Sequence, residues 1–161
     1  MRSVLALVAV AWAGSPAWAQ LVPDYEPLVE PIGRIMAGCL EQSYDDDSAL
    51  ACEDLTHRAC LAMGRGADTT FGRVMCAMLL DDLWDAELNR LWSLVLDGRD
   101  AAQAERLRDE QRAWVDHRDA ACRFAVAEVA GGSMAAHVGG DCRVRMTAER
   151  IVAFREILRY R

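Results

Sequence analysis

The chain has 161 residues, about the size of one domain, and carries eighteen arginines, no lysine and twenty-five acidic residues, for a formal net charge of −7. This acidity argues against a nucleic-acid partner, because binding to a phosphate backbone requires clustered cations. It suits a basic partner, although a net charge of this size also serves to keep a small exported protein in solution.

The first nineteen residues have the pattern of a cleavable export signal. Arg2 precedes an apolar run over residues 4–13, and Ala17 and Ala19 are the small residues that a signal peptidase reads. The run is too short to span a bilayer, and no cysteine directly after it could accept a lipid. We therefore expect residues 1–19 to be a signal peptide and the mature protein, beginning at Gln20, to be periplasmic or secreted with no membrane anchor after cleavage.

Two short helices are predicted after the signal. Pro23 and Pro27 favour an extended segment over residues 20–30, and Pro31 suits the first turn of a helix. Ser48 can cap a second helix, whose inner face would carry Cys52, Leu55, Ala59 and Met63. Residues 31–70 are therefore predicted to form a short helical hairpin extension.

Three longer helices are predicted in residues 71–161. The first covers about 72–97 and ends at Gly98, and the second opens with a capping box of Asp100 and Gln103 and runs to about 130. Its buried face would hold Ala104, Leu107, Gln111, Trp114, Arg118, Ala121, Cys122, Ala125 and Val129. A glycine-rich loop to Gly140 precedes a last helix from Cys142 to Tyr160. The fold class is all-α: a small disulfide-stapled helical bundle of two short helices followed by three longer up-and-down helices.

Six cysteines in an exported chain are best interpreted as disulfides. Cys52 and Cys60 lie eight residues apart on one helix, about 12 Å, and cannot bridge each other. The order of the helices pairs Cys39 with Cys52, Cys60 with Cys76, and Cys122 with Cys142. A metal site is not favoured, because neither Cys-x-x-Cys nor His-x-x-x-His spacing occurs.

The most specific motif lies in residues 111–122, where one helix face carries Gln111, Trp114, Arg118 and Cys122. An inward Arg118 requires a carboxylate, for which Asp85 and Glu87 are candidates. With Glu87-Leu88-Asn89 before it, Gly131-Gly132-Ser133 after it, and then Cys142 and Thr147-x-x-Arg150, this pattern resembles the LprI-type lysozyme-inhibitor family over about residues 76–158. His117 departs from the family, which more often has Tyr or Phe there.

The resemblance implies a small exported helical domain whose motif residues hold the fold more than they touch a partner. These residues are Glu87, Asn89, Gln111, Trp114, Arg118, Asp119, Gly131, Gly132 and Arg150. The family name implies a cationic lysozyme-type enzyme as partner. Contacts to such a partner are expected from loops, and the candidates are Asp45, Asp46, Asp47, Ser133 and the loop over residues 131–140.

No catalytic arrangement is visible in the sequence. His57, His117 and His137 are widely spaced and are interpreted as surface or loop residues, Ser133 lacks a nucleophile-elbow pattern, and Asp81 and Asp82 suit a solvated face. We therefore predict a protein that is not an enzyme and has no cofactor or metal. Three functions remain open: an inhibitor of lysozyme-type glycosidases, a periplasmic binding module with an unknown partner, or a hydrolase that uses the carboxylates, for which no catalytic arrangement is visible.

Overall fold

The computed structural model describes residues 25–64, 69–129, 132 and 134–160. The predicted signal peptide and Gln20 lie outside the described residues. Five helices make up the described chain, which confirms the all-α class: α1 (Glu26–Gln42), α2 (Asp46–Met63), α3 (Thr70–Leu96), α4 (Ala101–Glu128) and α5 (Ala135–Arg159). Within the described segments, no helix is both long enough and apolar enough to cross a membrane.

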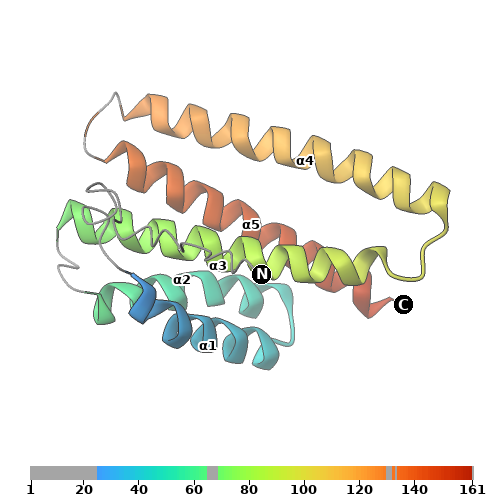
Figure 1. The fold of residues 1–161 in the computed structure, drawn as a ribbon, viewed down its shortest axis with the longest axis horizontal. Helices are drawn as coiled ribbons and strands as arrows, with labels where there is room; N and C mark the ends of the chain where they lie inside the picture. The colour runs from blue at the N-terminus through green and yellow to red at the C-terminus, as the bar shows by residue number, and fades with distance from the viewer. Residues whose placement is uncertain (1–24, 65–68, 130–131, 133, 161) are drawn as a thin grey trace, which may run out of the picture.

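The helices α3 and α5 share the most extensive interface and form the centre of the bundle. Figure 1 shows the hairpin of α1 and α2 on one side of this pair and α4 on the other. The single hydrophobic core draws its buried residues from α1, α2, α3 and α5, whereas α4 contributes partly buried side chains such as Leu107 and Trp114. The predicted hairpin extension and the region after it therefore share one core.

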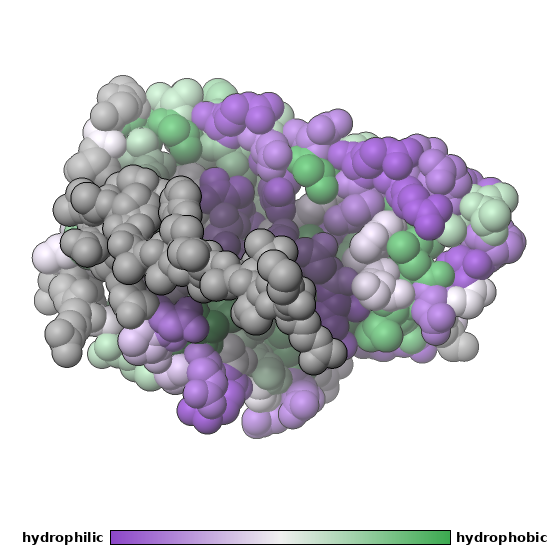
Figure 2. All heavy atoms as spheres, in the orientation of Figure 1, coloured by the Kyte–Doolittle hydropathy of each residue, from purple (hydrophilic) through white to green (hydrophobic). Residues whose placement is uncertain are grey.

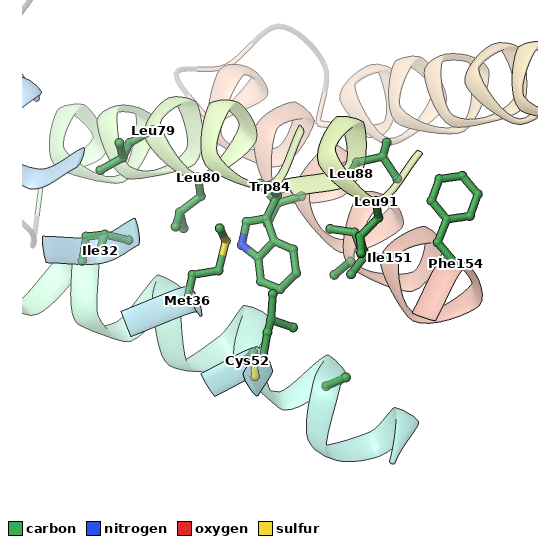
Figure 3. Packing of buried hydrophobic residues seen from close by; sticks show 14 of the residues in the cluster. Ile32, Met36, Cys52, Leu79, Leu80, Trp84, Leu88, Leu91, Ile151 and Phe154 are labelled. Carbon is green, nitrogen blue, oxygen red and sulfur yellow. The ribbon is translucent and has the colours of Figure 1, made fainter. Parts of the chain in front are cut away.

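Trp84 of α3 is fully buried at the centre of this core. Its indole points from α3 towards Met36 of α1 and Cys52 of α2 (Figure 3). The indole Nε1 donates a hydrogen bond of 3.3 Å to Oγ1 of Thr56, which satisfies both polar groups in the apolar interior. Burial of this large ring therefore ties the hairpin to the central helix pair.

All three predicted disulfides are confirmed. They join Cys39 to Cys52, Cys60 to Cys76 and Cys122 to Cys142, with Cα–Cα distances of 5.7, 5.8 and 5.5 Å. Each bridge links two consecutive helices, and the Cys60–Cys76 bridge crosses the predicted boundary at residue 70.

The start of the first helix was predicted wrongly. α1 begins at Glu26 with Pro27 in its first turn, so residues 26–30 are helical and Pro31 lies inside the helix. Packing explains the difference, because Leu28 and Val29 contact the core and the hydroxyl of Tyr25 donates a hydrogen bond to Asp82 of α3. Tertiary contacts therefore outweigh the cost of a proline within the helix.

The second helix also differs from the prediction. Asp45, not Ser48, is the N-cap, and the two residues form a reciprocal capping box. The buried stripe is formed by Ala49, Cys52, Thr56 and Cys60, whereas Leu55 and Met63 are 38 % and 46 % exposed. The polar Thr56 replaces Leu55 on the inner face because Trp84 supplies its hydrogen-bond partner.

The last helix begins at Ala135, so the predicted loop to Gly140 is wrong for residues 135–140. Gly139 and Gly140 are buried within α5, where they permit close helix contact. A Cβ atom on Gly140 would lie 2.7 Å from Cβ of Ala77 on α3, and one on Gly139 would lie 2.9 Å from Cγ2 of Val126 on α4. These glycines are therefore required for packing and do not form a turn.

The fourth helix opens with the predicted capping box of Asp100 and Gln103. The prediction of a long buried face on this helix is wrong, because only Ala104 and Cys122 are buried on α4. The reason is that α4 packs substantially against α5 and not against α3. The remaining residues of the predicted face are partly exposed: Leu107, Gln111, Trp114, Arg118, Ala121, Ala125 and Val129. Of these, Arg118 lines a cleft that also includes residues of α3 and α5.

Candidate functional site

A polar cleft lies where α3, α4 and α5 converge. Its volume is about 300 Å³, and its lining residues are Asp81, Asp82 and Asp85 of α3, Arg118 of α4 and Arg143 of α5. A second opening of about 390 Å³ adjoins it between α4 and α5 and shares both arginines. Figure 2 shows hydrophilic residues lining the recessed surface below α4. We call the first opening the α3–α5 cleft.

Arg118 is the motif residue that reaches this cleft from α4. Its side chain is 15 % exposed, its Nη1 lies 3.6 Å from Oδ1 of Asp85, and its Nε donates a 3.1 Å hydrogen bond to Asp119. Asn89 in turn donates a 2.8 Å hydrogen bond to Asp85. Asp85 is thus confirmed as the partner that the sequence predicted for Arg118.

The prediction that Glu87 could be the partner of Arg118 is wrong. Its carboxylate accepts two hydrogen bonds from Arg90, at 2.6 and 2.7 Å. Residues two apart on a helix point in divergent directions, so Asp85 and Glu87 cannot both face α4. Glu87 instead lines an opening that includes residues of α1 and Arg155 of α5.

Two guanidinium groups lie within cation–π distance of the Trp114 ring. The Cζ atoms of Arg118 and Arg150 are 5.2 and 5.5 Å from its ring centroid. Arg150 also donates two hydrogen bonds to Oε1 of Gln111, at 2.9 and 2.8 Å, and forms an ion pair with Glu110. Charge, cation–π contact and hydrogen bonding therefore fix how α4 lies on α5.

The structure brings six residues of the predicted family motif into one continuous network, together with Asp85 and Glu110. The motif residues in the network are Asn89, Gln111, Trp114, Arg118, Asp119 and Arg150. Gly132 lies in the connection after α4, where its N–H donates to the carbonyl of Val129 and its own carbonyl accepts from Ala135. Gly131 and Ser133 lie outside the described residues.

Three charged residues of the cleft, Asp81, Asp82 and Arg143, were not predicted from the sequence to belong to a site. Nε of Arg143 donates a 2.7 Å hydrogen bond to Asp81, and the hydroxyl of Tyr25 donates a 3.0 Å hydrogen bond to Asp82. The latter bond is the main reason that the pKa of Tyr25 is raised. Adjacent aspartates among arginines look like a solvated face in sequence, and only the approach of α5 reveals the cleft.

The balance of charge in the cleft is negative. Three carboxylates face two guanidiniums, and both guanidiniums already contact aspartates. Asp82 is exposed and has no ion-pair partner among the described residues. Its carboxylate is therefore the group in this cleft that can form an ion pair with a cation that enters.

The three aspartates predicted as partner contacts do not line this cleft. Asp45 caps α2, and hydrogen bonds from Ser48 lower the pKa of its carboxyl group. Asp46 lies 3.5 Å from Nη1 of Arg159, while Asp47 is exposed in the first turn of α2. Two of the three therefore have roles within the fold.

Two histidines are not the separate surface or loop residues that the sequence predicted. His57 of α2 and His137 of α5 have ring centroids 6.2 Å apart, and both contact Asp141. His137 is buried within α5, while His117 is exposed on α4 as predicted. Among the described residues, no group of three or more His, Cys, Asp or Glu side chains is arranged to hold a metal ion.

Comparison with known proteins connects this architecture to a family. The family described as lysozyme inhibitor LprI matches residues 60–153, from the end of α2 to the last turns of α5. A relative from Rhizobium meliloti, described as an uncharacterized protein, is 32 % identical over 87 residues, which cover 46 % of this chain and 63 % of the relative. The chain thus spans less than two thirds of that protein's length. No solved structure matches significantly.

Proposed function

This chain belongs to the lysozyme inhibitor LprI family, and on that premise we propose that the mature protein binds a lysozyme-type glycosidase and blocks its activity. The protein performs no chemistry of its own and needs neither metal nor cofactor. The observation that carries the proposal is that the family match includes the residues of α3, α4 and α5 that build the α3–α5 cleft.

The α3–α5 cleft is the proposed contact region. An arginine or lysine on the rim of the target's active site enters beside Asp82, whose exposed carboxylate becomes its ion-pair partner. Arg118 and Trp114 hold α4 in position and do not contact the target. The motif residues thereby shape the surface that binds.

Electrostatic attraction accelerates the encounter. The formal charge of −7 over the whole chain draws a cationic enzyme towards the protein, and such steering raises association rates by about 10 to 10³-fold. Asp45, Asp46 and Asp47 contribute to this long-range field. Exposed charges of this kind are screened by salt, so association slows as ionic strength rises.

Export is part of the proposal. Residues 1–19 act as the cleaved signal, and the mature protein resides in the periplasm or is secreted. Three disulfides support this location, because such bonds persist in oxidising compartments.

The second candidate function is a periplasmic binding module that recognises another partner and inhibits nothing. It draws support from the same α3–α5 cleft, since a polar opening of about 300 Å³ also suits a cationic peptide segment. The two functions differ in one observable quantity, which is the rate of cell-wall lysis in the presence of the protein.

The test uses the purified mature protein, beginning at Gln20, with several lysozymes acting on isolated cell walls at low salt. We expect a dose-dependent loss of lytic rate at micromolar protein, relieved when the salt concentration is raised. Titration calorimetry with the same enzymes reports binding separately. Binding without a loss of lysis would favour the binding module, and absence of both would reject lysozyme as the partner.

A further inference from the structure

A largely buried titratable cluster joins α2 to α5. Nδ1 of His137 lies 3.2 Å from Oδ2 of Asp141, and Nδ1 of His57 lies 3.9 Å from Oδ1 of the same carboxylate. The side chains of His57, His137 and Asp141 are only 19 %, 11 % and 33 % exposed. One carboxylate therefore faces two imidazoles, one from each helix.

Two atoms of this cluster are buried without a hydrogen-bond partner. They are Nδ1 of His137 and Oδ1 of Asp141. An unsatisfied buried polar atom is costly, and a proton on each imidazole nitrogen would convert both contacts with Asp141 into charge-assisted interactions. Positive charge on the imidazoles would therefore strengthen the cluster.

The neighbouring charges set the direction of the effect. Glu53 lies one helical turn before His57, and burial raises the pKa of both Glu53 and Asp141 above the ordinary carboxyl values. Nearby cations reduce these shifts only in part, and the other charged groups that act on the pair are Asp54 of α2, Arg73 of α3 and Arg145 of α5. Two half-buried carboxylates therefore gain from any further positive charge.

We propose that His57, His137 and Asp141 form a proton-operated contact that holds α2 against α5 more tightly in mildly acidic than in alkaline solution. Histidine is the side chain that changes charge between pH 5 and 8. A protonated imidazole at either position would place a positive charge beside Asp141 and form a charge-assisted contact with it, whereas neutral imidazoles would leave the carboxylate facing uncharged groups.

The two carboxyl groups act in the same direction. A carboxyl group whose pKa is raised by folding contributes stability that is complete below its unfolded pKa and is lost as pH rises through its folded pKa. Glu53 and Asp141 both have raised pKa values, so they too make the folded state more stable in acid. The carboxyl contribution should therefore grow as pH falls through the raised folded-state pKa values of Glu53 and Asp141, in addition to any contribution of the two imidazoles.

The contact has a structural consequence beyond general stability. The family match begins at residue 60, so His57 lies in the amino-terminal hairpin before the match and His137 lies within it. Protonation thus regulates how firmly the α1–α2 hairpin is attached to the family domain. This inference is independent of any lysozyme partner.

The first test compares melting temperatures at pH 8 and pH 5.5 for the wild type, the double variant His57→Gln/His137→Gln and the control His117→Gln. His117 is exposed on α4 and reports the general effect of losing a histidine. We expect an acid-induced gain of about 3 °C or more in the wild type and control, and less than half of it in the double variant. Equal gains in all three proteins would overturn the proposal.

The second test does not depend on the stability of a variant lacking both histidines. Nuclear magnetic resonance follows the titration of each histidine ring in the wild type and in Asp141→Asn. The substitution should lower the titration midpoints of His57 and His137 by about 0.5 pH unit or more and leave His117 unchanged. Unchanged midpoints at His57 and His137 would show that Asp141 does not stabilise their protonated forms.

Discussion

The indole of Trp114 on α4 lies against the guanidinium of Arg150 on α5, with 5.5 Å between Cζ and the ring centroid. Because α4 packs substantially on α5 alone, this contact is central to the position of the whole helix. The same guanidinium covers the ring of Phe154 at 4.6 Å, which links the α4 contact to the buried core.

Replacing Trp114 with alanine should therefore lower the free energy of unfolding by about 2–4 kcal/mol, through lost packing and lost cation–π contacts. Urea denaturation of the purified protein measures the effect. Phe124→Ala is a matched control on the same helix, because Phe124 is 68 % exposed, and it should change stability by only about 0.5 kcal/mol. Similar losses in the two variants would argue against the structural role of Trp114.

The pair of Arg118 and Asp85 should contribute a modest interaction energy. Asp85 is half exposed, so solvent screens the pair and a double-mutant cycle with alanine should give about 0.5–1 kcal/mol of coupling. Arg118→Ala alone should cost more than this coupling, since Arg118 also packs on Trp114. If Arg118→Ala kept the wild-type melting temperature but abolished binding to a lysozyme, Arg118 would be a contact residue instead.

Two glycine substitutions should have opposite effects on stability. Gly140→Ala places a Cβ atom 2.7 Å from Cβ of Ala77, and such overpacking between α3 and α5 should cost about 1–3 kcal/mol. Gly38→Ala in α1 meets nothing within 4 Å and should stabilise the helix by about 0.5–1 kcal/mol. Thermal melting of both variants checks the prediction, and equal shifts of the same sign would contradict the tight α3–α5 packing.

Removing the Cys122–Cys142 bridge should loosen α4. The bridge closes a segment of 20 residues, for which chain entropy gives about 3 kcal/mol, and it is the disulfide that joins α4 to α5. The variant Cys122→Ala/Cys142→Ala should lose about this much stability, and amide hydrogen exchange should accelerate more in α4 than in α2. Uniform acceleration of exchange over all helices would indicate that the bridge does not stabilise α4 more than the other helices.

The sequence was sufficient for features that depend on local periodicity and helix order. These include the helix count, the Asp100–Gln103 capping box and the three disulfide pairs, because a stripe of apolar residues and the direction of consecutive helices determine which cysteines can meet.

Features that depend on contacts between distant residues could not be predicted in the same way. Pro31 and Gly140 look like helix boundaries in sequence, yet packing against α3 keeps both within helices. His57 and His137 are far apart in the chain, and no spacing rule indicates that α2 and α5 bring them together. The α3–α5 cleft exists because the backbone of α4 packs mainly against α5 and not against α3, which periodicity does not reveal.

The proposed binding surface is tested by comparing two charge reversals that change the net charge equally. Asp82→Arg alters the α3–α5 cleft, and Asp47→Arg alters the exposed first turn of α2. Long-range steering is weakened in both variants, while a direct contact is lost only where the partner docks. Melting temperatures confirm first that both variants are folded.

The deciding measurement is the inhibition constant of the wild type, Asp82→Arg and Asp47→Arg against one cationic lysozyme at low salt. We predict that the wild type inhibits and that Asp82→Arg weakens inhibition about tenfold or more relative to Asp47→Arg, mainly through faster dissociation. Equal inhibition constants for the two variants, or no inhibition by the wild type, would contradict the claim that the α3–α5 cleft binds the enzyme.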